Sequence, residues 1–232
     1  MKVLDIDVGN TFLKWRVSGA RPQRGQMTVS DLTQGDWPSG VGRVRVASVA
    51  GAPVNNALQA FALQRWGVCV EFARTAVCQA GVTNSYVDPS RMGIDRWLAM
   101  LSAYQRAGRS CWVVDCGSAI TVEQLTDDGR HVGGYIIPGL RLMSKNLLAN
   151  TAEIIVDHSV DHFSYAPGVN TSQAVQHGVN LMFTALAAQV QRMAQEQPVY
   201  VTGGDGQLFC AQQERFIWSP DLVFDGLELA LG

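Results

Sequence analysis

The sequence contains one pattern twice, and this duplication constrains the fold more than any other feature. The stretches "VLDIDVGNTFLKWRV" and "CWVVDCGSAITVEQL" each run from an apolar segment through an aspartate, a glycine and small polar residues into a second strand-like segment. Their aspartates, Asp7 and Asp115, stand 108 positions apart. A repeat at this long spacing indicates two equivalent halves, each beginning with a strand, a turn and a second strand. We therefore expect two domains, residues 1–108 and 109–232.

Composition places the chain among ordinary globular proteins. It has 232 residues, a hydrophobic share of 47%, a charged share of 16% and a formal net charge of −2. The lack of a cationic excess argues against nucleic-acid binding, and no apolar run approaches the roughly 20 residues that a membrane helix needs. Five cysteines without a CxxC pair fit a reducing compartment. We expect a cytoplasmic protein with no nucleic-acid or membrane partner.

Hydrophobic periodicity, with breaks at glycine and proline, predicts alternating strands and helices. The predicted strands are residues 2–8, 12–17, 44–51, 68–73, 111–115, 120–125, 131–137 and the beginning of 199–206. The predicted helices are 53–67, 94–108, 140–154 and 171–197, followed by a short strand and a short apolar helix at the end. The polar segment from residue 78 to Gly93 is predicted as a long loop, and ordered loops of that length tend to be functional.

The two aspartate turns have the chemistry of a phosphate site. In "DVGNT", the carboxylate of Asp7 lies beside backbone N–H groups and a hydroxyl. The donors can bind phosphate oxygens, and the carboxylate can hold the divalent cation that neutralises them. A single turn of this kind is equally typical of ordinary turn chemistry. The second copy, at Asp115, favours the functional interpretation.

A third glycine turn, "TGGDG" (Thr202–Gly206), offers a backbone surface against which adenosine can lie. Neither GxxxxGK[ST] nor a GxGxxG following a strand occurs, so P-loop and Rossmann nucleotide sites are excluded. The three glycine turns together favour a nucleotide site of another kind.

The order of six motifs resembles that of the type III pantothenate kinases. The motifs are "DVGNT", "GIDRW", "DCGSAITV", "GGYIIPGL", "NTSQAVQHG" and "TGGDG", and they extend over essentially the whole chain. That family belongs to the superfamily of acetate and sugar kinases, heat-shock ATPases and actin. The resemblance implies an α/β fold: two duplicated ribonuclease H-like (actin-like ATPase) domains with mixed sheets flanked by helices, and an active site in the cleft between them.

The resemblance also implies a reaction. ATP would phosphorylate pantothenate to 4'-phosphopantothenate, the first step of coenzyme A biosynthesis, with Mg²⁺ and a monovalent cation, K⁺ or NH₄⁺, in a homodimer. Asp95 would be the catalytic base, Asp7 the magnesium ligand, directly or through water, and Asp115 the monovalent cation contact. The nucleotide- and phosphate-binding residues would be Asp7, Gly9, Asn10, Thr11, Lys14, Gly117, Ser118, Thr121, Gly203 and Gly204. The pantothenate-binding residues would be Tyr86, Gly93, Arg96 and Thr171, and Tyr86 and Thr171 could come from opposite subunits.

Residue chemistry supports part of this assignment. Asp95 falls in the first turn of a predicted helix, where the helix dipole favours an anion, so we expect it to be ionised across the neutral range. The planar fork of Arg96 can bind the carboxylate of pantothenate. An arginine beside an aspartate is, however, more often a surface ion pair, so both interpretations of Arg96 stay open here.

Two residues depart from the usual family pattern. Ser118 stands where threonine is common, and Glu123 where aspartate is common. Because the hydroxyl and the charge are kept, we expect function to be retained with some change in nucleotide or cation affinity. Two alternatives remain: a nucleotide-binding accessory or regulatory protein of the same fold, and a superfamily kinase or phosphohydrolase for another small substrate. The loop "SYVDPSRMGIDRW" discriminates between pantothenate and another small substrate, because it is expected to line the acceptor pocket.

Other polar residues have simpler interpretations. Asp5 alternates with Asp7 along the first strand, but Val113 replaces it in the second copy, so we predict a supporting role. The four histidines are scattered, and the segment Asp157–Phe163 ("DHSVDHF") is predicted to be a solvated loop, so no zinc site is assigned. Cys116 is predicted to be a packing residue.

Overall fold

The computed structural model of the protein describes residues 2–18, 22–151, 154 and 162–232. Two compact units make up the chain. Unit 1 comprises Met1–Arg109, Asp127–His131 and Asp221–Gly232, and unit 2 comprises Ser110–Thr126 and Val132–Pro220. The domains predicted from the sequence, 1–108 and 109–232, stay a prediction. The compact units differ from them chiefly because the last twelve residues pack with the first half of the chain.

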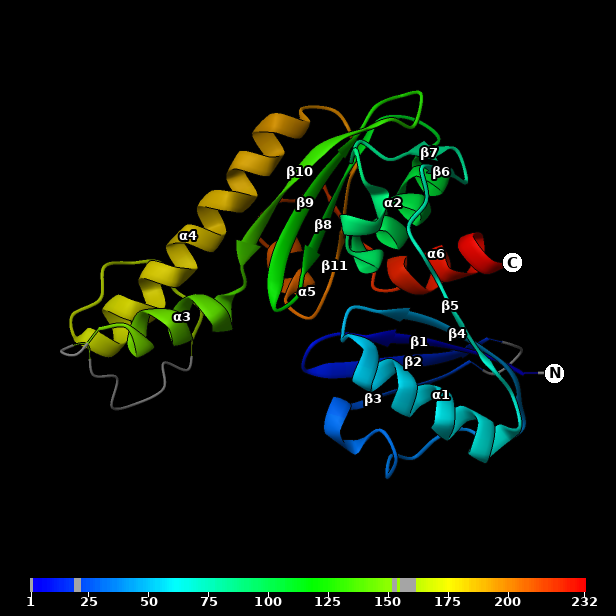
Figure 1. Ribbon diagram of the computed structural model, residues 1–232. Helices are drawn as coiled ribbons and strands as arrows, with labels where there is room; N and C mark the ends of the chain where they lie inside the picture. The colour runs from blue at the N-terminus through cyan, green and yellow to red at the C-terminus, as the bar shows by residue number, and fades with distance from the viewer. Residues whose placement is uncertain (1, 19–21, 152–153, 155–161) are drawn as a thin grey trace. The chain divides into compact units, whose positions relative to one another are not determined.

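Unit 1 is built on a five-stranded sheet with the order β3-β2-β1-β4-β5 (Figure 1). Its strands are β1 (Lys2–Val8), β2 (Phe12–Ser18), β3 (Gln23–Thr28), β4 (Val41–Ser48) and β5 (Val70–Phe72). The first three strands are antiparallel neighbours, whereas β4 runs parallel to both β1 and β5. The sheet is therefore mixed, with the hairpin β1–β2 near its centre.

The two faces of this sheet have opposite chemistry because side chains alternate along each strand. Leu4, Ile6 and Val8 point to one face and form a buried core with Leu58 of helix α1 (Ala52–Trp66). Asp5 points to the other face, which helix α6 (Leu222–Leu231) covers by packing on β1 and β4. Alternation thus separates an apolar core from a charged layer within one sheet.

Helix α2 (Ile94–Ala107) completes unit 1. The short strands β6 (Cys78–Gln79) and β7 (Val82–Thr83) and the 3-10 helix η2 (Pro89–Arg91) precede it. The helix ends at Gly108, whose left-handed conformation suits glycine. Along its length α2 packs against α6. An added Cβ at Gly226 of α6 would lie 2.2 Å from the carbonyl oxygen of Leu98, so the missing side chain permits this close approach.

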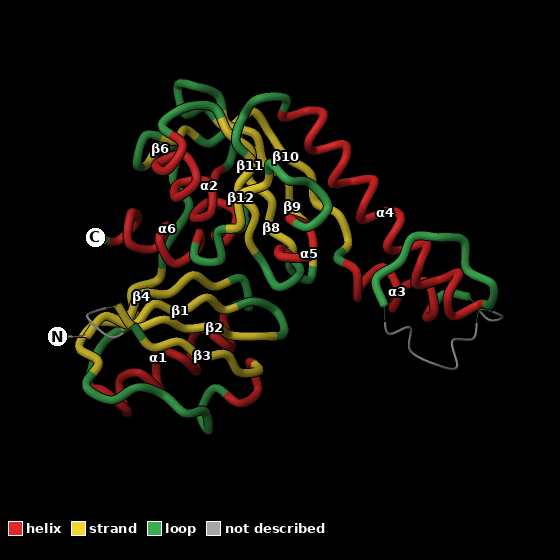
Figure 2. Tube along the Cα trace, turned by 180° about the vertical axis from the view of Figure 1, so that it is seen from behind, coloured by secondary structure: helices red, strands yellow, loops and turns green. Residues whose placement is uncertain are grey.

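Unit 2 repeats the sheet topology of unit 1 (Figure 2). Its order is β10-β9-β8-β11-β12, with strands β8 (Cys111–Cys116), β9 (Ala119–Leu125), β10 (His131–Pro138), β11 (Val199–Thr202) and β12 (Phe216–Trp218). As in unit 1, the first two strands form an antiparallel hairpin, and the fourth runs parallel to the first and the fifth. The duplicated α/β fold with mixed sheets flanked by helices is confirmed.

Three helices accompany this second sheet: α3 (Leu140–Ala149), α4 (Thr171–Ala194) and α5 (Gly206–Cys210). Val114 and Ile120 of the sheet form a buried core with Phe183 of α4 and Phe209 of α5. The two views show α3 alongside the N-terminal part of α4, which extends beyond the sheet (Figures 1 and 2). The side chain of Asn170 caps α4 by accepting a hydrogen bond from the Gln173 amide at 2.9 Å.

Most predicted elements occur within a few residues of their expected bounds. The strand expected at 44–51 runs from Val41 to Ser48, since Gly51 adopts a left-handed φ of 81° before α1. The helix expected at 140–154 ends at Ala149. Neither α5 nor the short pair β6–β7 was predicted, because both are too short to show a periodic pattern.

Candidate functional site

The first aspartate turn has four residues, Gly9 to Phe12, between the last paired residues of the β1–β2 hairpin, Val8 and Leu13. Asp7 lies directly opposite Lys14 in the strand register, and Val8 lies opposite Leu13. The Gly9 amide donates to the Phe12 carbonyl at 3.0 Å and closes the turn. Asn10 and Thr11 at its tip are exposed. These two side chains are therefore available to a ligand at this end of the sheet.

Asp7, Lys14 and Asp95 are electrostatically coupled. The pKa of Asp7 is raised to about 6, first because burial removes water from the carboxylate and second because the charge of Asp95 repels it, while Lys14 lowers the pKa. The carboxylates of Asp7, near the end of β1, and Asp95, in the first turn of α2 (Ile94–Ala107), are oxygen donors of the kind that a hydrated divalent cation binds. The arrangement therefore fits the magnesium role that the family resemblance gives to Asp7.

Asp95 lies at the start of α2, next to Gly93. Its Oδ1 accepts a hydrogen bond from the Arg96 amide at 2.8 Å. A Cβ added to Gly93 would lie 2.5 Å from that same oxygen. The role of Gly93 in the structure is thus to leave room for the Asp95 carboxylate in this position.

Arg96 points into the protein rather than along its surface. The residue is only 6% exposed, and its Nη1 donates to the Tyr86 hydroxyl at 3.0 Å. Its guanidinium carbon lies 5.7 Å from the centroid of the Tyr86 ring, within cation–π range. The surface position considered from the sequence is therefore wrong for Arg96. The long loop that carries Tyr86 and the first turn of α2 that carries Arg96 form one cluster.

His131 belongs to the same cluster, and sequence reasoning missed it. Its ring stacks on Tyr86 with centroids 6.4 Å apart, and its Nδ1 lies 2.9 Å from Ser85 Oγ. The Asp127–Gly129 turn brings His131 there, because the Gly129 carbonyl accepts a hydrogen bond from the Thr83 amide at 3.0 Å. A lone histidine after a turn gives no sequence signal for such a contact.

The second aspartate turn is one residue shorter than the first. Asp115 lies opposite Thr121 and Cys116 opposite Ile120, which leaves three residues in the turn. The Gly117 amide donates to the Ala119 carbonyl at 3.0 Å, and the Ser118 carbonyl accepts from the Gly139 amide at 3.0 Å. The Ser118 side chain is exposed. Its hydroxyl therefore has the same access to a ligand as the tip of the first turn.

The glycine turn after β11 lies against the second aspartate turn. Gly203 has a φ of 91°, and an added Cβ would lie 2.4 Å from Asp115 Oδ1 and 2.5 Å from the Cys116 carbonyl oxygen. The Asp205 amide donates to the same carbonyl at 3.0 Å. At Gly204 the corresponding position is open. Unit 2 thus brings together the predicted monovalent cation contact, Asp115, and the predicted nucleotide residues Gly203 and Gly204.

Asp205 and Cys116 are two further titratable groups beside the second aspartate turn. Burial raises the pKa of Asp205, which the sequence did not single out, and Arg141 lowers it. Burial, followed by the charges of Asp115 and Asp205, raises the pKa of the Cys116 thiol far above its usual range. Cys116 is fully buried and stays a thiol, so it has a packing role.

Glu123, one of the two departures from the family pattern, is buried at 1% exposure on β9. It lies opposite Val113, and an added Cβ at Gly134 of the neighbouring strand would lie 2.0 Å from its Oε2. Glycine at this position leaves space for the longer glutamate side chain.

Thr171, the remaining predicted pantothenate contact, is exposed at the start of α4 in unit 2. It lines an apolar groove of about 630 Å³ together with Leu147, Ile154, Gly168, Val169, Asn170, Ala174, Val175, Gly178, Val179 and Met182. Tyr86, Gly93 and Arg96, by contrast, belong to unit 1.

Within the described ranges no group of three or more His, Cys, Asp or Glu side chains gathers as a metal site. Most of the Asp157–Phe163 segment lies outside the described residues, so its interpretation as a loop stays a prediction. Among the helices that the structure describes, none combines the length and apolar character needed to cross a membrane.

Solved structures share this fold over nearly their whole length. A conserved Baf family protein from Campylobacter jejuni has a TM-score of 0.63 at 20% sequence identity, covering 97% of this chain and 95% of its own. A protein from Sinorhizobium meliloti described as a 2-dehydro-3-deoxygalactonokinase has a TM-score of 0.59 at 14% identity, covering 98% and 95%. At such identities the likeness establishes the fold alone. The class that the fold defines is therefore a duplicated α/β protein with two mixed sheets flanked by helices.

Sequence comparison narrows the class to a family. The family model of type III pantothenate kinases matches residues 3–196. A type III pantothenate kinase from Chromohalobacter salexigens is 36% identical over 242 residues, covering 97% of this chain and 86% of the relative. The chain belongs to the type III pantothenate kinase family.

Proposed function

We propose that the protein transfers the γ-phosphoryl group of ATP to the primary hydroxyl of pantothenate, giving ADP and 4'-phosphopantothenate, the first step of coenzyme A biosynthesis. Family membership supports the reaction. The observation that carries it in the structure is the position of Asp95. This carboxylate begins α2 beside the Arg96–Tyr86 cluster and is electrostatically coupled to Asp7 of the first turn.

Asp95 acts as the base in this proposal. As the pantothenate hydroxyl oxygen bonds to the γ-phosphorus, the bond from that phosphorus to the β–γ bridging oxygen breaks, ADP leaves and the hydroxyl proton passes to Asp95. Arg96 binds the pantothenate carboxylate through its guanidinium, and Tyr86 and Gly93 contact the same substrate. Phosphoryl transfer depends mostly on positioning and on neutralising phosphate oxygens, so these few groups suffice.

The glycine turns hold the nucleotide in this proposal. Backbone amides and hydroxyls of the two aspartate turns bind phosphate oxygens, and Gly203 and Gly204 lie by the adenine. The open space at Gly204 supports that placement. Asp7 holds Mg²⁺, which supplies positive charge to the phosphate oxygens when bound. Asp115 contacts the monovalent cation, K⁺ or NH₄⁺, and the nearby Cys116 carbonyl supports an oxygen-rich site.

A cytoplasmic homodimer is the state that we propose for the working enzyme. The apolar groove along α3 and α4 supports it, since Met182 is 60% exposed and Val169 is also exposed. Thr171 lines this groove, so a second copy covering it would place Thr171 at the subunit contact. Light scattering should give twice the chain mass, and Met182→Glu should lower it. A monomeric wild type would contradict the dimer.

The decisive assay follows 4'-phosphopantothenate formation from ATP and pantothenate, with and without K⁺, in the wild type and in Asp95→Asn. Loss of a base that positions the hydroxyl should lower kcat by 10²-fold or more, on the order of general-base effects, while ATP binding is kept. Thermal stabilisation by ATP is the control, since a ligand at 100 times its dissociation constant adds about 2.7 kcal/mol. Full activity in the variant would contradict the base role. ATP binding by a wild type without turnover would favour the accessory protein.

A further inference from the structure

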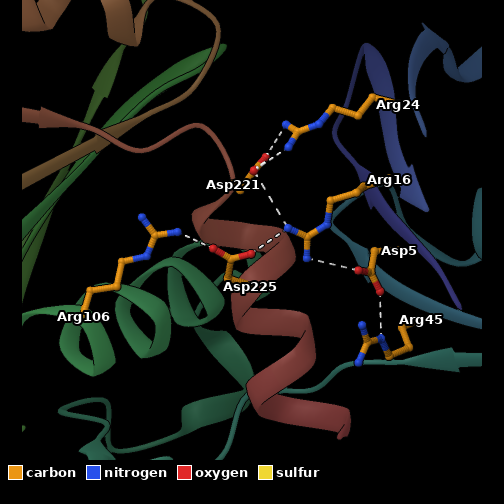
Figure 3. A network of polar contacts seen from close by, with 7 residues as sticks. All are labelled: Asp5, Arg16, Arg24, Arg45, Arg106, Asp221 and Asp225. Atoms are coloured by element: carbon orange, nitrogen blue, oxygen red, sulfur yellow. Dashed lines mark hydrogen bonds and ion pairs between the residues drawn. The ribbon is translucent and has the colours of Figure 1, made fainter. Parts of the chain in front are cut away.

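The C-terminal helix α6 joins an ionic network that reaches five other elements of unit 1, the strands β1 to β4 and helix α2 (Figure 3). Asp225 Oδ1 accepts a hydrogen bond from Arg16 Nη1 at 2.6 Å, and its Oδ2 accepts one from Arg106 Nη2. Arg16 lies on β2, whereas Arg106 lies in the last turn of α2. A single carboxylate of α6 therefore connects the sheet to helix α2.

The sheet side of this network is buried and continues to β1. Arg16 Nη2 donates to Asp5 Oδ2 at 3.3 Å, and Asp5 Oδ1 accepts from Arg45 Nε at 2.7 Å. Asp5 is fully buried. Because side chains alternate along a strand, Asp7 points to the same face of the sheet as Asp5. The network thus ends one side chain away from the proposed magnesium ligand.

The helix side of the network leads to the proposed base. Arg106 lies in the last turn of α2 and Asp95 in its first turn, and a helix can carry coupling between two sites as a rigid element. Gly226, the residue after Asp225, packs directly on the backbone of Leu98 in the middle of α2. The contact of Asp225 with Arg106 and the contact of Gly226 with Leu98 hold α2 to α6 at two points.

We propose that Asp225 is a positioning residue: by joining Arg16 to Arg106 it fixes how α2 lies against the sheet, and therefore where Asp95 lies relative to Asp7. This inference rests on the proposed kinase function. The negative charges of Asp7 and Asp95 repel each other, and the network opposes their separation. The family model matches residues 3–196, so helix α6 lies outside the matched segment.

A matched pair of arginine variants tests the proposal. Arg106→Gln removes the ionic link from α6 to α2 and keeps the Gly226–Leu98 contact, at a residue whose side chain is 39% exposed. Arg24→Gln is the control: this side chain is 53% exposed and donates to Asp221 at 2.6 and 2.7 Å, so its loss removes a link from α6 to β3 only. Asp225→Asn removes the central carboxylate charge.

Steady-state kinetics with ATP and pantothenate should separate the variants. We expect Arg106→Gln and Asp225→Asn to lower kcat about tenfold, with both KM values within about twofold, because misplaced reacting groups slow the chemical step. The double variant should be no slower than Asp225→Asn alone. Arg24→Gln should keep kcat within about twofold of the wild type.

Three results would overturn the proposal. If kcat is unchanged in Arg106→Gln, the link to α2 does not position Asp95. If Arg24→Gln slows the reaction as much as Arg106→Gln, the cause is general loosening of α6. If the kcat of the slower variants equals that of the wild type when both are measured at a lower temperature, partial unfolding explains their loss of activity at the higher temperature. A wild type that forms no 4'-phosphopantothenate contradicts the proposed function itself, whereas an active wild type with unaffected variants contradicts only the role of Asp225.

Discussion

The two strand-turn-strand units share a backbone but differ in charge. In unit 1, Asp5 on the first strand lies between Arg16 and Arg45 on the neighbouring strands. The equivalent positions of unit 2, beside Val113, are Glu123 and Tyr200. The aspartate and two arginines of one unit thus correspond to a valine, a glutamate and a tyrosine in the other.

The turns differ in the same way. Asp7 faces Lys14 across the first hairpin, whereas Asp115 faces Thr121 across the second, whose turn is one residue shorter. Under the proposed function, unit 1 carries the charged groups closest to the reaction, Asp7, Lys14 and Asp95. Unit 2 mainly binds the nucleotide. The two copies therefore share one backbone arrangement. Their chemistry differs because Lys14 lies opposite Asp7, whereas Thr121 lies opposite Asp115.

The largest effect on stability should come from replacing the buried Asp5 of unit 1 with the residue at the equivalent position of unit 2. Asp5→Val copies Val113 and leaves Arg16 and Arg45 without their shared buried partner. We expect a loss of about 3–5 kcal/mol in the free energy of unfolding, measured by urea denaturation. Glu196→Gln, which breaks an exposed ion pair with Arg215 in unit 2, should cause no measurable change. Equal stability of Asp5→Val and the wild type would refute the comparison.

The next effect separates the two aspartate turns by activity. Asp7→Asn should lower kcat/KM for Mg-ATP about 100-fold, because it removes the proposed magnesium ligand. Asp115→Asn should instead raise the K⁺ concentration for half-maximal activity about tenfold, the effect of losing roughly one hydrogen bond or ion contact. Titrations with Mg²⁺ and K⁺ measure both. Identical responses of the two variants would show that the turns are functionally equivalent.

A pH series tests the electrostatic origin of this difference. Because the pKa of Asp7 is raised from 3.8 to about 6 in the folded state, its ionisation opposes folding. The cost is absent below pH 3.8, grows as pH rises toward 6 and is constant above. Without Mg²⁺, Asp7→Asn should be more stable than the wild type by about 1–3 kcal/mol at pH 8, and the gain should shrink on acidification. A gain that does not vary between pH 4 and 8 would exclude this cause.

The smallest effect distinguishes two adjacent glycines of unit 2. Gly203→Ala introduces a Cβ against Asp115 at a left-handed backbone position, so it should cost about 1–3 kcal/mol and raise the KM for ATP. Gly204→Ala enters open space and should change stability by less than about 0.5 kcal/mol. Urea denaturation and ATP kinetics measure both. If Gly204→Ala is the more damaging variant, the backbone of Gly204 itself contacts the nucleotide.

The sequence predicted the site unevenly. Asp7 and Asp115 were found because each ends a strand and precedes a glycine, which is a local pattern. The contact of His131 with Tyr86 was not predicted, because it joins residues far apart in the sequence. Burial of Arg96 was likewise unpredictable, because an arginine beside an aspartate has the same local pattern on a surface and in a core.

By itself, the sequence determined the duplication, the order of strands and helices and the chemistry of the three glycine turns, because alternation, helical periodicity and turn preference act between near neighbours. Tertiary structure alone decided that the last helix packs with the first half of the chain, that Asp225 joins Arg16 to Arg106, and that Asp95 raises the pKa of Asp7. These contacts depend on burial and on distances between elements far apart along the chain, and no local pattern encodes either.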